Sequence, residues 1–177
     1  VKTGDTTITS QLTGTYNFDN INAAVTIGEY FEIPLSKIQQ GIAAYCPSNN
    51  RSQWIKTTNN NILLDAYNAN PTSMSAAIKS FIDVDAKAKL VILGDMLELG
   101  QYAQSEHQAI VDTLKESSIH DAILVGALFG TTNAEGFKCF DNTESVKKHL
   151  EKQAVKDHTI LIKGSRGIAL EQLLDLL

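Results

Sequence analysis

The amino-acid sequence predicts an α/β protein whose main part is a mostly parallel β-sheet covered by helices on both faces. Two observations carry this prediction. Short, continuous apolar runs such as Leu90–Leu93 and Ala122–Val125 indicate strands that are buried on both faces. Segments with apolar residues at helical spacing alternate with these runs. Such alternation is typical of a three-layer fold in which a parallel sheet lies between two layers of helices.

The composition is that of an ordinary globular protein, and it narrows the class of function. The 177 residues are 43% hydrophobic and 20% charged, with a formal net charge of -5. Because the basic residues form no cluster, we expect no nucleic-acid partner. Without a signal peptide or an apolar run of about 18 residues, we expect a cytoplasmic protein with no membrane insertion. Cys46 and Cys139 have no metal or redox spacing and are interpreted as small apolar residues in a reducing compartment.

The first fifty residues predict too few elements for a hydrophobic core of their own. Residues 6–12 alternate in a way that indicates a strand, and helical spacing begins near Phe18 and ends before Ile33-Pro34. A second helix follows over Leu35–Tyr45, and the polar segment Cys46–Asn50 is interpreted as a linker. We therefore expect the tail of a domain whose body lies elsewhere.

The rest of the chain predicts the elements of the sheet and its helices. The expected strands are Gln53–Thr57, Ile62–Ala66, Leu90–Leu93, Ala122–Val125, Phe137–Phe140 and Thr159–Ile162. The expected helices begin at Asn70-Pro71, at a capping box of Ser105 and Gln108, and at Asn142 or Thr143, and the last is Ile168–Leu177. The first two strands predict a hairpin. The order of the strands in the sheet does not follow from the sequence.

Ligands of open parallel sheets bind outside the carboxyl ends of the strands, so four loops are candidates for a site. They are residues 65–71, 94–100, 126–130 and 163–167. In the last loop, two glycines permit close backbone approach, and Lys163, Ser165 and Arg166 supply donors at the start of a helix. This combination suits a carboxylate or a phosphate. The alternative is that Gly164 and Gly167 only make the turn and the cations are solvated.

The other candidate side chains have simpler interpretations beside the functional one. Asn70 is expected to cap a helix, which leaves roles for Asp65, Tyr67 and Asn68 open. Asp95 and Glu98 suit either a ligand or a turn. His107 is expected to be a partly exposed helix residue rather than a catalytic base. The sequence contains no metal-ligand spacing, no P-loop and no nucleophile elbow, so we assign no catalytic residue and no metal ligand.

The candidate loops carry a resemblance to one enzyme family. The segment Asp65–Met74 resembles the D-[DS]-Y-N-A-N-P-x-S-M stretch of the UDP-N-acetylmuramoyl-tripeptide–D-alanyl-D-alanine ligases, the MurF family of Mur ligases. Gly94–Gly100 resembles their G-[DE]-M-x-E-L-G loop, and Lys163–Glu171 resembles their K-G-S-R-x-x-x-[LM]-E ending. Gly14–Ala24 is similar to the G-x-H-N-x-x-N-x-x-A-A segment that Mur ligases share.

This resemblance implies a domain organisation. Residues 1–47 would be the C-terminal tail of a central ATP-binding domain, and residues 48–177 would be the Rossmann-like C-terminal domain of the ligase. The P-loop lysine and the main magnesium ligands of the family would lie upstream of Val1, which is itself not a methionine. We therefore expect a fragment that is inactive alone.

The resemblance also implies roles for individual residues. Asn17 and Asn20 would contact adenine, Arg51 would reach the phosphates of ATP, and Asp65 would bond the ribose hydroxyls. The residues that would border the D-Ala-D-Ala site are Asn68, Asn70, Lys163, Gly164, Ser165 and Arg166. Two positions depart from the family pattern, because Tyr16 stands where histidine is usual and Ala66 stands where aspartate or serine is usual.

The implied reaction uses ATP and Mg²⁺ to join D-Ala-D-Ala to UDP-MurNAc-tripeptide in peptidoglycan precursor synthesis. ATP would phosphorylate the tripeptide carboxylate, and the dipeptide amine would displace phosphate. Positioning and charge stabilisation would carry the catalysis. Three alternatives stay open. They are a sister Mur ligase, a folylpolyglutamate synthetase-like ligase and a stand-alone, non-catalytic ligand-binding domain. The D-N-P-R motif of the sister ligase is absent from this sequence. The oligomeric state and the third residue of the peptide do not follow from the sequence.

Overall fold

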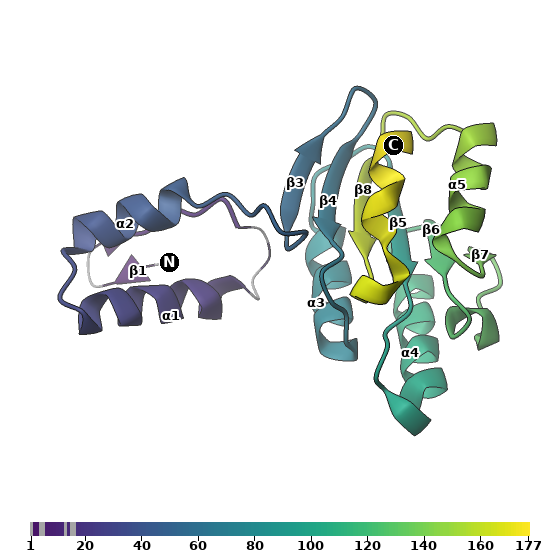
Figure 1. Cartoon of the computed structure of the whole chain (residues 1–177), viewed down its shortest axis with the longest axis horizontal. Helices are drawn as coiled ribbons and strands as arrows, with labels where there is room; N and C mark the ends of the chain where they lie inside the picture. The colour runs from purple at the N-terminus through teal and green to yellow at the C-terminus, as the bar shows by residue number, and fades with distance from the viewer. Residues whose placement is uncertain (1, 4–5, 13, 15–16) are drawn as a thin grey trace. The chain divides into compact units, whose positions relative to one another are not determined.

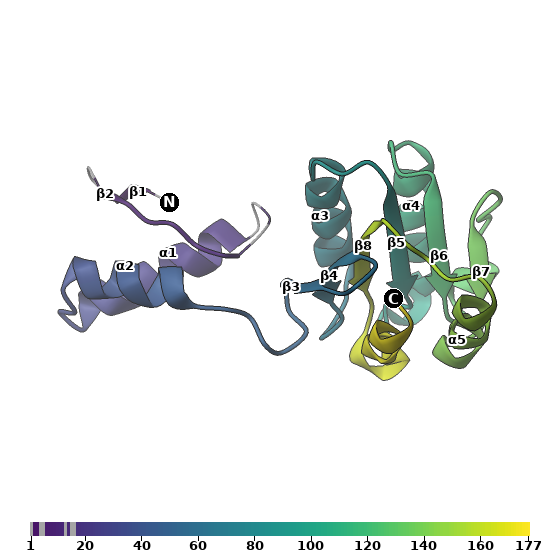
Figure 2. The same ribbon diagram turned by 90° about the horizontal axis from the view of Figure 1, so that it is seen from above.

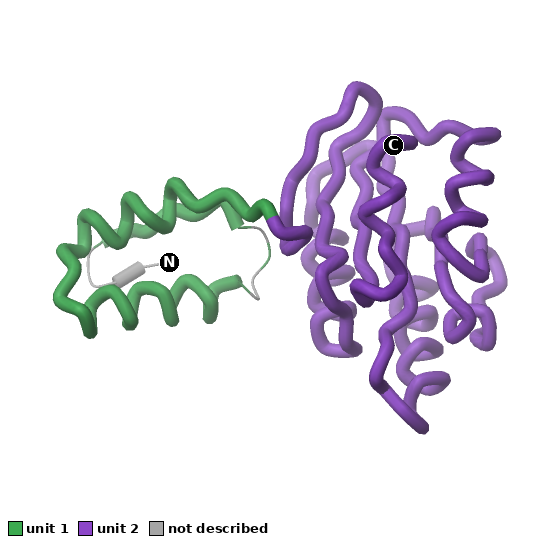
Figure 3. Tube along the Cα trace, in the orientation of Figure 1, with its two compact units in different colours: residues 1–48 green, residues 49–177 purple. Residues whose placement is uncertain are grey.

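The computed structural model describes residues 2–3, 6–12, 14 and 17–177, and it consists of two compact units. Figure 3 distinguishes unit 1, residues 1–48, from unit 2, residues 49–177. The sequence placed a domain boundary after residue 47, within the linker that it predicted. The assignment of unit 1 to the tail of an ATP-binding domain stays a prediction.

Unit 1 is small and largely helical. Strands β1 (Lys2–Thr3) and β2 (Thr6–Thr7) pair antiparallel, so the strand expected over residues 6–12 contributes only two residues to a sheet. Helices α1 (Asn17–Tyr30) and α2 (Leu35–Ala44) match the two helices that the apolar spacing predicted. The buried apolar residues of the unit are Ile8, Ile21, Val25 and Ile38.

Unit 2 contains a six-stranded sheet with the order β3-β4-β8-β5-β6-β7. Its strands are β3 (Gln53–Lys56), β4 (Asn61–Asp65), β5 (Lys89–Gly94), β6 (Asp121–Val125), β7 (Lys138–Phe140) and β8 (Thr159–Lys163). Strands β3 and β4 form the expected antiparallel hairpin, and all the other neighbours in the sheet are parallel (Figure 1). The mostly parallel sheet that the apolar runs predicted is therefore confirmed.

Helices cover both faces of this sheet, as Figure 2 shows. Helices α3 (Pro71–Ile82) and α4 (Ala103–Lys115) lie on one face, and α5 (Thr143–Lys152) lies on the other with the 3₁₀ segment η4 (Leu170–Leu176). Side chains alternate between the faces along each strand, so Leu63 packs with the α3/α4 layer while Ile62 and Leu64 pack with the opposite layer. Burial of each large apolar side chain contributes about 1.5–3 kcal/mol, which makes these two layers the core of the unit.

Local sequence explains where most helices begin, and two expectations were wrong. Asn70 caps α3 through a hydrogen bond from the Ser73 amide, and Asn142 caps α5. Helix α4 does not begin with the expected capping box, because a 3₁₀ turn η1 (Gly100–Tyr102) runs into the helix and Ser105 Oγ donates to the Tyr102 carbonyl. Ile168–Leu177 does not form an α-helix. Ala169 adopts a left-handed backbone and separates η3 (Arg166–Ile168) from η4.

Across the described residues, no helix is both long and apolar enough to cross a membrane. The two cysteines are free thiols, and both are exposed. Burial of part of its surface raises the pKa of the Cys139 thiol.

Candidate functional site

The sheet order brings the predicted loops together at one edge of unit 2. Strand β8 is last in the chain but lies between β4 and β5, so its loop 163–167 lies between the loop 65–70 after β4 and the loop 94–100 after β5. The loop after β6 follows next along the same edge. This carboxyl edge, the lower end of the strands in Figure 1, is the candidate site.

A buried ion pair joins the loops after β4 and β8. Lys163 Nζ lies 2.6 Å from Asp65 Oδ2 and donates a second hydrogen bond of 3.3 Å to the Asn68 carbonyl. The other carboxylate oxygen of Asp65 accepts from the Ser52 amide at 3.1 Å. The structure thus places Lys163 against protein partners rather than at the surface, because its side chain is only 3% exposed.

The two asparagines after β4 are exposed, and their side-chain oxygens bond nearby backbone. Asn68 Oδ1 accepts from the Ala69 amide at 2.9 Å, and Asn70 Oδ1 accepts from the Ser73 amide at 2.8 Å. Ala66, where the family usually has aspartate or serine, packs in the apolar layer beneath η4. A hydrogen-bonding side chain at position 66 would point into this apolar layer, so the small apolar side chain of alanine suits the position.

The loops after β8 and β5 approach each other backbone to backbone. The Ser165 amide donates to the Asp95 carbonyl at 3.1 Å, and Ser165 Oγ accepts from the Leu97 amide at 2.9 Å. A Cβ atom on Gly164 would lie 3.0 Å from the Gly94 Cα, which is tighter than most Cβ contacts, so glycine favours this close approach. Gly164 and Ser165 consequently shape the edge, and both are buried.

Arg51, Tyr67 and Arg166 form an exposed cluster at the edge. The Arg51 guanidinium carbon lies over the Tyr67 ring at 3.8 Å from its centroid, and that of Arg166 lies 5.6 Å from the same centroid. Both arginines are exposed, and neither makes an ion pair with any described residue. The sequence assigned the two arginines to different ligands and left Tyr67 without a role. Tyr67 is thus the residue that sequence reasoning missed, although its place in the D-x-Y-N motif was a signal.

The loop after β5 is held by side chains whose roles are structural. Both oxygens of the Asp95 carboxylate accept backbone amides, those of Leu128 and Phe129, at 2.9 Å. This capping interaction fixes the loop after β6 to the loop after β5. Glu98 is exposed and has a positive φ of 69°, which places it in the turn. Turn chemistry, one of the two interpretations left open for Asp95 and Glu98, describes what both residues do here.

The expectation of a partly exposed His107 was wrong, because this side chain is fully buried. His107 Nε2 accepts from the Met96 amide at 3.0 Å, and Nδ1 lies 2.6 Å from the Ala103 carbonyl. An Nε2 atom that accepts a hydrogen bond carries no proton, so the geometry assigns the neutral ring with its proton on Nδ1. The 3.6 Å approach of Nε2 to Asp95 Oδ1 is then not an ion pair. The ring thus ties α4 to the loop after β5.

The segment after β8 does not form the helix that was expected to bind an anion. Its α-helix was expected to offer free amides to an anion, but the residues after Ser165 form the short 3₁₀ segment η3 instead. A three-residue turn carries little macrodipole, since the helix dipole needs several aligned peptides. Among the candidate residues of this edge, the exposed cations are Arg51 and Arg166, because Lys163 is buried.

Unit 1 contains the other predicted nucleotide contacts. Asn20 Nδ2 donates to Asn17 Oδ1 at 3.0 Å, and Asn17 is buried. Asn20 also lines an apolar cleft of about 380 Å³ within this unit. The remaining lining residues are Ser10, Leu12, Ile21, Ala24, Gly41, Ile42 and Tyr45. Tyr16, the departure from the family histidine, lies outside the described residues.

Within the part of the chain that the structure describes, no group of three or more His, Cys, Asp or Glu side chains could hold a metal ion.

Comparisons with known proteins agree with the motif resemblance. The family model described as Mur ligase, glutamate ligase domain, matches residues 50–166. A Bacillus subtilis protein named UDP-N-acetylmuramoyl-tripeptide–D-alanyl-D-alanine ligase is 34% identical over 171 residues, which are 90% of this chain and 37% of that protein. A Buchnera aphidicola protein of the same name is 34% identical over 97% of this chain and 38% of its own length. This chain thus spans less than two fifths of the length of both relatives.

Solved structures show the same relationship. A crystal structure of MurF from Acinetobacter baumannii superposes with a TM-score of 0.81 at 27% identity, covering 96% of this chain and 39% of that one.

Proposed function

The chain belongs to the Mur ligase family, and from that premise we propose that it forms the C-terminal domain, with the last elements of the central domain, of an ATP-dependent ligase for D-Ala-D-Ala. The acceptor would be UDP-MurNAc-tripeptide. The names of the relatives support this choice of dipeptide and acceptor. The single observation that carries the proposal is that Arg51 and Arg166 lie over the same Tyr67 ring at the carboxyl edge, where Tyr67 and Arg166 belong to loops that match the family motifs.

We assign the two arginines to the two anionic ligands that such a reaction brings together. Arg166 would hold the free carboxylate of the dipeptide, because a guanidinium with free in-plane donors can bond a carboxylate in bidentate fashion. Arg51 would contact ATP phosphates. Held by its carboxylate, the dipeptide would present its amine to the acyl phosphate, and the domain would contribute orientation.

Asp65 keeps the capacity for its proposed ribose contact. Its carboxylate accepts from Lys163 and from the Ser52 amide, and a carboxylate has about four acceptor positions. Lys163 would act by holding Asp65 in place rather than by touching the dipeptide directly. Asn17 and Asn20 of unit 1 would contact adenine, and the apolar cleft beside Asn20 suits a flat, uncharged base. Magnesium would bind mainly to a part of the ligase upstream of this chain.

The proposal is tested by exchanging Arg166 for alanine in the complete ligase. Loss of a charge-assisted hydrogen bond is worth roughly 1.5–3 kcal/mol, so the KM for D-Ala-D-Ala should rise about 10–150-fold while that for ATP changes little. Arg166→Lys should restore only part of the loss. A normal dipeptide KM in a folded Arg166→Ala enzyme would remove this residue from the site. The 177-residue chain alone should release no phosphate from ATP, because its sequence contains no P-loop.

A further inference from the structure

The sequence contains only two arginines, Arg51 and Arg166, and the structure places both of them over one aromatic ring. The other basic residues of the chain are lysines. Arginine differs from lysine in that its flat guanidinium stacks on an aromatic face while its in-plane N–H groups stay free for an anion. The two arginines come from distant parts of the chain and share one ring. Their position therefore depends on the fold and suits the binding of anions.

The two cations lie close together, and neither forms an ion pair with a described carboxylate. Their distances to the ring centroid are 3.8 and 5.6 Å, so the two guanidinium carbons are at most 9.4 Å apart. At that separation the like charges repel each other, and salt screens them only in part. The carboxylate of Asp65, in the same loop as Tyr67, is bonded to Lys163 and to the Ser52 amide. The electron-rich face of Tyr67 is the group that the structure offers to both cations.

The backbone fixes the partners of this arrangement. The Tyr67 amide donates to the Asn50 carbonyl at 3.2 Å. This hydrogen bond holds Asn50, the neighbour of Arg51, against the backbone of Tyr67. Asn50 and Ser52, on either side of Arg51, both have positive φ values, of 57° and 46°. Asparagine adopts this conformation more readily than most residues, whereas for Ser52 it is costly and persists where the surroundings impose it. The backbone conformation of residues 50–52 therefore fixes the position of Arg51.

We propose that Tyr67 is a positioning residue, whose ring holds Arg51 and Arg166 in place together so that the sites for their two anions are formed before ligands bind. The assignment of those anions, ATP phosphate for Arg51 and the dipeptide carboxylate for Arg166, rests on the proposed function. The arrangement of the ring and the two arginines does not. Loss of the ring should weaken both sites at once, whereas loss of one arginine weakens one.

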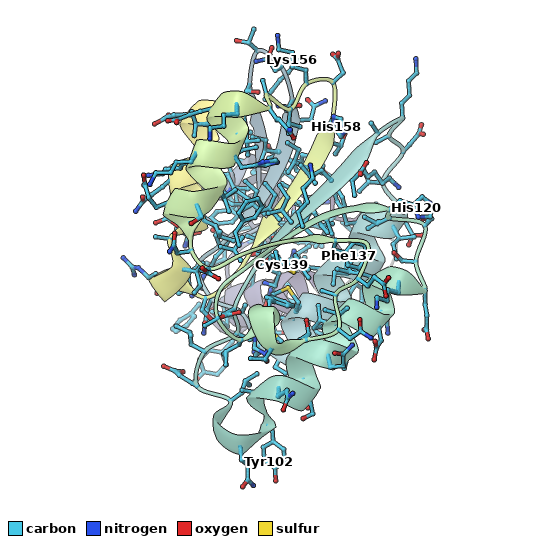
Figure 4. The ribbon with its side chains drawn as sticks, turned by 90° about the vertical axis from the view of Figure 1, so that its right-hand side faces the viewer. Tyr102, His120, Phe137, Cys139, Lys156 and His158 are labelled. Atoms are coloured by element: carbon cyan, nitrogen blue, oxygen red, sulfur yellow. The ribbon has the colours of Figure 1, made fainter. Side chains whose placement is uncertain are left out.

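The arrangement itself can be tested in the 177-residue chain by NMR. Labelling arginine with ¹⁵N gives two Nε–Hε signals, which Arg51→Lys and Arg166→Lys assign. Protons above an aromatic ring are shifted by it, so Tyr67→Leu should move both signals and Tyr67→Phe should leave them nearly in place. Tyr102 is the matched control. It is an exposed tyrosine at the same end of unit 2, and Figure 4 shows it pointing away from the ribbon. If Tyr67→Leu moves neither signal, or Tyr102→Leu moves both equally, the proposal is wrong.

The consequence for binding is tested in the complete ligase. A cation–π contact at an exposed site corresponds to about a two- to fivefold change in affinity, so Tyr67→Leu should raise the KM for ATP and for D-Ala-D-Ala by about that factor each. Tyr67→Phe and Tyr102→Leu should leave both KM values unchanged. In an Arg166→Ala background, Tyr67→Leu should no longer affect the dipeptide KM but should still affect that for ATP.

The outcomes separate the two proposals. Equal effects of Tyr67→Leu on the dipeptide KM with and without Arg166 would show that the tyrosine does not act through this arginine, which overturns the positioning role. A protein with the expected NMR shifts but no D-Ala-D-Ala ligase activity would instead contradict the proposed function and leave the arrangement of Tyr67 and the arginines established.

Discussion

Units 1 and 2 bury their apolar side chains to very different extents. In unit 2, two layers of buried residues cover both faces of the sheet. In unit 1, the buried cluster is far smaller, and Tyr30 and Phe31 are 80% and 69% exposed. Further large apolar residues of unit 1 are exposed as well: Phe18, Ile27, Ile33 and Tyr45. Apolar surface of this kind marks an interface, which supports the proposal that unit 1 completes a larger ATP-binding domain.

The comparison also separates two kinds of contribution to function. Unit 2 has a core of its own, and that core fixes the loops of the carboxyl edge. Unit 1 offers two asparagines beside an apolar cleft. If stability is divided between the units in the same way as burial, unit 1 should open more readily than unit 2.

The largest expected difference is in hydrogen exchange. Because local stability follows buried contacts, the amides of residues 18–45 should exchange about a thousandfold faster, or more, than those of Leu90–Leu93. Exchange measured by mass spectrometry or NMR on the 177-residue chain would give both rates in one experiment. Equal protection in the two segments would contradict the division and indicate one cooperative unit.

The buried ion pair should matter strongly to unit 2 and little to unit 1. Lys163→Met leaves the Asp65 carboxylate without its cation, and breaking one partner of a buried pair costs roughly 3–5 kcal/mol. Urea unfolding followed by the fluorescence of Trp54, the single tryptophan, reports on unit 2. The double variant Lys163→Met/Asp65→Leu is the control and should recover much of the loss. A loss below about 1 kcal/mol in Lys163→Met would show that the pair is effectively solvated.

Substitution of one glycine at the carboxyl edge should have a smaller effect. Gly126 has a φ of 127°, and a Cβ atom there would lie 2.2 Å from the Asp95 carboxylate. Gly126→Ala should therefore destabilise unit 2 by about 2–3 kcal/mol, through backbone strain and displacement of the Asp95 cap. Gly130→Ala, in the following 3₁₀ turn, is the control because its Cβ would meet no atom within 4 Å. Thermal unfolding that is the same for both variants would contradict this account.

The smallest expected effect concerns His149 on α5. Burial, and secondarily the charge of Lys138 3.4 Å away, lower the pKa of His149 below its ordinary value of about 6.5. A histidine with a lowered folded-state pKa takes up its proton more readily when unfolded. Unit 2 should therefore lose slight stability as the pH falls from about 6.5 through the lower, folded-state pKa, and unit 1 should be unaffected. NMR titration of the ring should show Lys138→Gln raising the pKa of His149, and an unchanged pKa would remove Lys138 as a cause.

Local pattern determined much of this protein. The apolar runs predicted the buried strands, and Asn70-Pro71 and Asn142 predicted helix starts, because capping depends on residues within one turn of each other. The motif loops identified the family. The closing segment was mistaken for an α-helix because its apolar spacing suits a helix, while the left-handed Ala169 that interrupts it has no signal in the local sequence.

Tertiary structure alone decided how those loops meet. The insertion of β8 between β4 and β5 depends on pairing between strands far apart in the chain, and that pairing leaves no local pattern. It buries Lys163 against Asp65 and brings Arg166 to Tyr67. The sequence by itself determined which residue types stand on which loops. Their roles depend on which loops become neighbours, because burial and charge pairing are set by partners distant in the chain.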